Sequence, residues 1–159
     1  MAVIIQQLVT SYIASAAFGL LFNVPRKQLL QGGLSGMLGW IFYFLLAQYG
    51  MNAELASIFA SIMIGGIGQA FAKVYKQPVI VFNVSGIIPL VPGGLAYDAM
   101  RHFVSNDYNI AIQLAAKAFL ISGGIAAGLV VSEVFTRIIV QSRLKKVEAA
   151  KPGSIFKRQ

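Results

Sequence analysis

Long apolar runs separated by short polar turns dominate the pattern along this chain. Five of these runs are long enough to cross a bilayer, because a transmembrane helix needs about 20 apolar residues. They lie at about 2–22, 30–49, 54–72, 78–104 and 110–140. The pattern therefore predicts an all-α, polytopic membrane protein with about five transmembrane helices.

The fourth apolar run is broken near its middle by Pro89, Pro92, Gly93 and Gly94. Each proline removes a helical hydrogen-bond donor and frees the carbonyl four residues before it. Freed backbone groups at membrane depth are tolerated only where protein or a water-filled cavity satisfies them, and broken helices line the substrate sites of many transporters. The motif predicts two half-helices with a candidate substrate site between them.

The composition supports a membrane protein and narrows its chemistry. The chain is 57% hydrophobic and 11% charged, with a mean hydropathy of +0.73, whereas a soluble domain is about a quarter charged. It has no cysteine and one histidine, which excludes disulfides, thiolate metal sites and multi-histidine sites. No nucleophile–base arrangement, phosphate loop or metal-ligand spacing is present. We therefore expect no enzyme activity, no cofactor and no nucleic-acid partner.

The basic residues predict the orientation in the lipid bilayer. Of the 13 lysines and arginines, eleven fall on one side of the predicted spans: two after the first span, two after the third and seven near and after the end of the fifth. Because basic loops stay in the cytoplasm, the N-terminus should lie outside and the C-terminus inside. A transmembrane domain at 1–141 is then followed by a basic cytoplasmic tail at 142–159.

Polar groups around the break are the first candidate site. The candidate substrate-binding residues are Asn83, Ser85, Pro89, Pro92, Gly93, Gly94 and Tyr97. The side chains of Asn83 and Ser85, with the freed carbonyls of Ser85 and Ile88, would coordinate a hydroxyl or ammonium group. The backbone amides after Pro92 would face a carboxylate, because helix N-termini favour anions. The alternative is that Asn83 and Ser85 only tie neighbouring helices together.

Two further ionisable residues are candidates for coupling. Asp98 lies one turn beyond the break and shares a helix face with Arg101 and His102. Ionisable residues within spans are functional candidates by default, so Asp98 would carry a coupling proton; alternatively it forms a local ion pair with Arg101. Lys117 would pair with Asp98, meet a substrate carboxylate, or extend to the membrane interface.

Local spacing gives three smaller predictions. Glu133 and Arg137, four residues apart, should form an ion pair on a helix surface. Gln69, near the inner end of the third span, is a candidate for lining a path. Small residues recur at four-residue spacing in several spans, as at Gly124 and Gly128, which favours close helix packing, with a partner interface or pathway as the alternative.

Three segments carry a resemblance to a known family. FNVPRKQLL at 22–30, ASIMIGGIGQ at 60–69 and IIPLVPGGLAYDAM at 87–100 resemble the short subunit of the threonine/serine exporter family, the ThrE and YjjB-like proteins. The resemblance implies a multi-pass protein of the bacterial cell (inner) membrane. It further implies a membrane subunit of a secondary exporter of small amino acids or carboxylates, such as threonine, serine or succinate, proton-coupled and working with a YjjP-like membrane subunit.

The odd number of spans fits such a pairing. This chain would begin outside, and the resemblance implies a partner with five spans whose membrane part begins inside. The two would form an inverted pair with a site near the midplane. The alternative function is a non-transporting structural membrane subunit that stabilises a larger partner, because one chain alone does not hold a complete inverted repeat.

Overall fold

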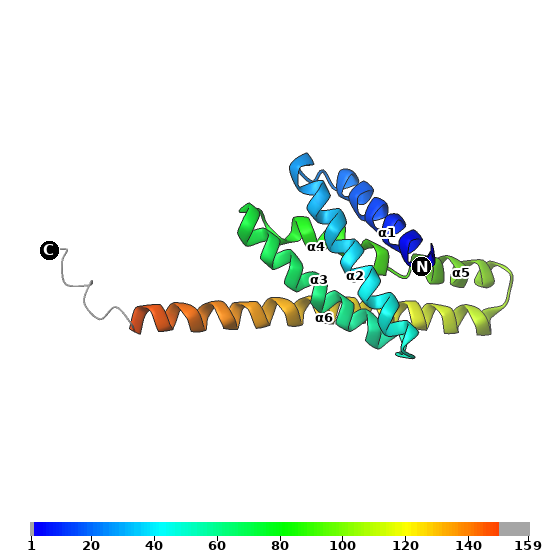
Figure 1. The fold of residues 1–159 in the computed structure, drawn as a ribbon. Helices are drawn as coiled ribbons and strands as arrows, with labels where there is room; N and C mark the ends of the chain where they lie inside the picture. The colour runs from blue at the N-terminus through cyan, green and yellow to red at the C-terminus, as the bar shows by residue number, and fades with distance from the viewer. Residues whose placement is uncertain (1, 150–159) are drawn as a thin grey trace.

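A computed structural model describes residues 2–149 of the chain, with side chains from residue 3 to 142. This part of the chain is helical throughout, and short turns join the helices (Figure 1). In chain order the elements are α1 (Ala2–Leu21), the 3-10 turn η1 (Arg26–Gln28), α2 (Leu29–Gln48), α3 (Ala53–Tyr75), α4 (Val79–Ile87), the 3-10 turn η2 (Ile88–Leu90), α5 (Gly93–Val104) and α6 (Tyr108–Ala149).

The predicted all-α membrane fold is confirmed, including the break in its fourth apolar run. Within residues 2–149, α1, α2, α3 and α6 are each long and apolar enough to cross a membrane. The α4–η2 segment and α5 meet the same test together and are bent by 51° at the break. The bend follows from the backbone at Val91, which is extended, and at Pro92, whose ψ of 50° is not helical.

One prediction about the break was wrong. The carbonyl of Ile88 is not free, because it accepts a hydrogen bond of 3.2 Å from the amide of Val91. The chain tightens into η2 before it bends, and a 3-10 turn replaces the lost i to i+4 bond with an i to i+3 bond. The break is therefore a closed turn at Ile88, and the extended backbone begins only at Val91.

Helix α3 lies at the centre of the fold, in contact with α2, α4 and α6 (Figure 1). The contact between α3 and α6 uses small residues: a Cβ on Gly128 would meet Ser61 Oγ and, at 2.6 Å, the carbonyl oxygen of Ile58. One turn earlier, Gly124 lies against Ser57. The packing interpretation of the four-residue spacing is therefore confirmed for this pair of helices.

A second small-residue contact joins α1, α2 and α4. Gly36 of α2 lies against Ser15 of α1, and Gly32 of α2 lies against Ser85 of α4. Ser15 and Ser85 are almost fully buried. Because the contacting side chains are so small, α4 is held close between the two N-terminal helices, which fixes the rotation of α4 about its axis.

The last two helices form a hairpin. Helix α5 packs against the first turns of α6, at the right-hand end of Figure 1. At the end of α5, His102 Nδ1 lies 3.6 Å from Oδ2 of Asp107 in the turn that follows. This pair was not predicted from the sequence. Helix α6 then continues to Ala149, so the first part of the predicted tail at 142–159 is helical, while 150–159 lie outside the described residues.

Two single-cysteine variants test the predicted orientation, since the chain has no cysteine of its own. Ser105 follows α5 and Ser142 lies late in α6; both are exposed, and each donates a hydrogen bond to the carbonyl four residues earlier. In intact cells, a membrane-impermeant maleimide should label Ser105→Cys, whereas Ser142→Cys should react only after permeabilisation. The opposite pattern would contradict the predicted orientation, and labelling of neither or both from outside would contradict the crossing by α6, which lies between the two positions.

Candidate functional site

A cleft of about 620 Å³ lies between α3, α4 and α6. Small-molecule sites occupy roughly 300–1,000 Å³ and combine apolar walls with a few polar groups. The walls of this cleft are mostly aliphatic, for example Val79, Val84 and Leu129. Its polar lining residues are Gln69, Asn83, Glu133 and Arg137. The cleft therefore has the size and the mixed lining of a site for a small polar molecule.

Asn83 supplies an unsatisfied polar atom to this cleft. It lies in the second turn of α4, and its Oδ1 is buried without a hydrogen-bond partner among the described residues. The side-chain amide rests on Gly68 of α3, where any Cβ would meet Oδ1. A buried acceptor left unpaired costs about 1–3 kcal/mol. Asn83 thus holds an unpaired acceptor beside the cleft, and a turn of its side chain away from Gly68 would bring this oxygen to a ligand there.

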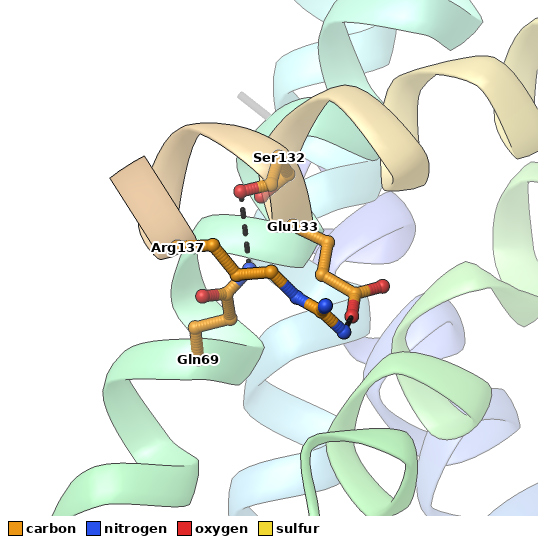
Figure 2. Close-up of polar contacts among 4 residues, drawn as sticks. All are labelled: Gln69, Ser132, Glu133 and Arg137. Carbon is orange, nitrogen blue, oxygen red and sulfur yellow. Dashed lines mark hydrogen bonds and ion pairs between the residues drawn. The ribbon is translucent and has the colours of Figure 1, made fainter. Parts of the chain in front are cut away.

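Glu133 and Arg137 provide the charges of the cleft. Arg137 bends back along α6 toward Glu133, with a nitrogen–oxygen distance of 2.6 Å (Figure 2), so the predicted ion pair is confirmed. The side chains of Arg137 and Glu133 are 75% and 59% exposed, respectively. Exposed pairs of this kind contribute about 0–1 kcal/mol. Where the cleft is open to water, a ligand with its own charges can therefore separate the two side chains at little cost.

Gln69 fixes the wall between the two long helices. Its Nε2 donates a hydrogen bond of 3.1 Å to the carbonyl oxygen of Ser132, across from α3 to α6 (Figure 2). One turn earlier on α3, a Cβ on Gly65 would lie 2.6 Å from Ser132 Oγ. This bond sets the register of α6 against α3, and it places Glu133 at the cleft.

The cleft lies toward one end of the helix bundle. Gln69 is six residues from the end of α3, about 9 Å along the helix, and Asn83 is close to the start of α4. The turn between these helices carries Lys76. With the orientation predicted from the basic residues, the cleft would lie near the cytoplasmic face.

Ser85 lies in a different environment from Asn83. It is 1% exposed, donates a hydrogen bond of 3.2 Å to the carbonyl of Val81, and contacts Gly19 and Gly32. These contacts favour the interpretation that Ser85 ties helices together. Asn83 and Ser85 lie only two positions apart on α4. Their side chains nevertheless face opposite directions, because residues i and i+2 do not share a helix face.

The glycines of the break lie in open surroundings. Apart from the adjacent residues and the backbone of their own helix, no described atom comes within 4 Å of a Cβ built on Gly93 or Gly94, and neither glycine has a positive φ. Pro89 is half-buried within η2. Pro92 borders an apolar hollow of about 250 Å³ against α6, and Ile87 and Leu129 line both this hollow and the cleft. The hollow at the break therefore lies next to the cleft along α6, with Ile87 and Leu129 between them.

The remaining candidate residues lie on the hairpin of α5 and α6. Tyr97 is 70% exposed, Asp98 is half-buried and Lys117 is exposed. Among the ion pairs of the described residues, Asp98 joins neither Arg101 nor Lys117. The local Asp98–Arg101 pair that was one alternative is thus not formed in this structure, and these residues do not contribute to the cleft.

The grouping of the cleft residues was not evident from the sequence. The sequence predicts separate roles for Gln69, for the Glu133–Arg137 pair and for Asn83, which it places at the break. Gly68, on which the Asn83 amide rests, lies in one of the segments that resemble the family. The residues come from three helices, and only the packing of these helices brings them to one cavity.

Comparison with known proteins gives the family. The model of a family described as threonine/serine exporter, ThrE, matches residues 7–135, which is most of the chain. The chain belongs to this family. No solved structure matches the chain. As a ThrE-family member it is a multi-pass membrane protein of a transporter family, not an enzyme, and the family implies export of threonine and serine. The matched segment includes Glu133 and ends two residues before Arg137.

Proposed function

We propose that this chain is one membrane subunit of a secondary exporter that carries threonine and serine, or related small carboxylates, out of the bacterial cell across the inner membrane. The observation that supports this function best is the cleft between α3, α4 and α6. There Asn83, which has an unpaired side-chain oxygen, and the charged side chains of Glu133 and Arg137 line one space. Under the predicted orientation this space receives its ligand from the cytoplasm.

The lining residues suit the groups that such substrates carry. The planar guanidinium of Arg137 can bind a carboxylate with two parallel hydrogen bonds. The free Oδ1 of Asn83 can accept a hydrogen bond from a hydroxyl or an ammonium group. Aliphatic residues such as Val84 and Leu129 cover the rest of the cleft, where they would contact the short carbon chain of the substrate.

The onward path would follow α6 toward the break. Ile87 and Leu129 separate the cleft from the hollow beside Pro92. In alternating access one bundle rocks against another around a fixed site, and the bend of 51° between α4–η2 and α5 is a place where such a motion can occur. Asp98 and Lys117 on the outward hairpin remain our candidates for proton coupling.

A second membrane subunit completes this proposal. Much of α6 is exposed along its length, including Val130, Val134 and Phe135 beside the cleft. An inverted partner, as in other transporters with a site between two repeats, would cover this side and close the cleft. We propose that the YjjP-like subunit takes this position.

Reconstitution tests the proposed function. Liposomes should contain this chain together with its partner subunit, this chain alone, or the partner alone, and uptake of radiolabelled L-threonine should be measured by counterflow against internal unlabelled L-threonine. We expect counterflow only with both subunits. Counterflow by this chain alone would contradict the two-subunit proposal. Transport by the partner alone, unaltered by this chain, would identify this chain as a non-transporting structural subunit instead, and counterflow of succinate without threonine would change the substrate class.

A further inference from the structure

We propose that Glu133 decides which class of substrate enters the cleft: its carboxylate binds the ammonium group of an amino acid and repels the second carboxylate of a dicarboxylate. This proposal rests on the proposed function, and it assigns substrate choice to one residue of the cleft. Glu133 would distinguish amino acids from dicarboxylates, whereas the residues around the break would not distinguish these two classes.

The arrangement of the charges carries the proposal. Glu133 and Arg137 lie one turn apart on the face of α6 that lines the cleft, and their side chains reach toward each other (Figure 2). An α-amino acid carries an ammonium and a carboxylate on one carbon. It can therefore bind Glu133 and Arg137 at once, in place of the ion pair between these two side chains. The exposed ion pair is weak, and the two new hydrogen bonds are charge-assisted on both sides.

Glu133 is better suited to bind the ammonium group of the substrate than the other polar groups of the cleft. Among the described lining residues, Glu133 is the single carboxylate and Arg137 the single cation. The amide nitrogen of Gln69 is already bonded to the carbonyl of Ser132. Asn83 offers a neutral acceptor oxygen, which suits the hydroxyl of threonine or serine. An ammonium group therefore finds its complementary charge at Glu133.

The same charge acts against dicarboxylates. A dicarboxylate bound to Arg137 would bring its second carboxylate into a small cleft beside Glu133, and discrimination is often achieved through such a repulsive element. Removal of the negative charge should weaken amino-acid binding and at the same time remove the repulsion. Glu133→Gln keeps the size of the side chain, so it changes the charge with little change in shape.

The experiment compares Glu133→Gln with wild type in the reconstituted two-subunit exporter, with counterflow of L-threonine and of succinate measured in parallel. We expect the apparent affinity for L-threonine to fall by about tenfold or more, as for loss of one charge-assisted hydrogen bond, and the ratio of succinate to threonine transport to rise. Glu54→Gln, the same change at the far end of α3, is the matched control and should leave the ratio unchanged. An unchanged ratio in Glu133→Gln would overturn the proposal.

A competition assay can be carried out on the wild-type exporter, so its result does not depend on whether a variant folds. We expect 3-hydroxybutyrate, which is threonine without its ammonium group, to inhibit L-threonine counterflow far more weakly than unlabelled L-threonine does. Equal inhibition by the two compounds would contradict the role of Glu133. Absence of any threonine or succinate counterflow in the wild-type complex would instead refute the proposed function itself, so the two failures are distinguishable.

Discussion

Replacement of Gly68 by alanine is expected to lower the apparent affinity for the substrate strongly while the protein still folds. The new Cβ would meet Oδ1 of Asn83, and the next described atoms are Asn83 Cγ at 3.2 Å and Phe82 Cβ at 3.6 Å. Because the first contact is the far end of a flexible side chain, the amide can turn away at little cost to the fold. The oxygen that we propose to bind the substrate would then leave its present place beside Gly68.

The expected loss for Gly68→Ala is about tenfold or more in the apparent affinity for L-threonine, the effect of losing a hydrogen bond worth about 1–3 kcal/mol. Gly66→Ala on the same helix is the matched control, because no described atom lies within 4 Å of its Cβ and both changes raise helix propensity alike. Both variants should give a monodisperse peak on size-exclusion chromatography in detergent. Wild-type affinity in Gly68→Ala would show that Asn83 does not bind the substrate.

The second large effect is expected at the contact between α3 and α6. In Gly128→Ala the new Cβ would lie 2.6 Å from the backbone oxygen of Ile58 and in contact with Ser61 Oγ. A backbone atom cannot turn away, so the two helices must separate. Overpacking of this kind typically costs about 1–3 kcal/mol, and here it also strains the hydrogen bond from Gln69 to Ser132.

Thermal unfolding in detergent, followed by size-exclusion chromatography after heating, measures this effect. Gly128→Ala should lower the midpoint temperature and the yield of folded protein. Gly123→Ala lies on the same helix and meets no described atom within 4 Å, so its midpoint should match or exceed that of wild type. A wild-type midpoint for Gly128→Ala would mean that α3 and α6 are not in close contact in the membrane protein.

The two predictions separate packing from binding. Gly68 and Gly128 both lie at close helix contacts. A methyl group at Gly68 would displace the side chain of Asn83, whereas a methyl group at Gly128 would press on the backbone of Ile58. Stability should therefore respond mainly to Gly128→Ala, and transport at normal stability mainly to Gly68→Ala. Small-residue spacing alone predicts the same result for both positions.

The sequence by itself determined the features that depend on local or one-dimensional patterns. Apolar runs gave the number and limits of the spans, because crossing a bilayer requires a minimum helix length. The prolines predicted the broken span, because proline removes a backbone donor wherever it occurs. The pair of Glu133 and Arg137 was predictable because residues four apart on one helix are always neighbours.

The tertiary structure alone decided which polar residues share a cavity. Asn83 and Ser85 look equivalent in the sequence, but the rotation of α4 between α1 and α2 turns Ser85 into a glycine-lined contact and Asn83 toward Gly68. The register of α6 on α3, held by Gln69 and Ser132, then places Glu133 and Arg137 at the same cleft. Rotation and register depend on contacts between segments far apart in the chain, which no local pattern encodes.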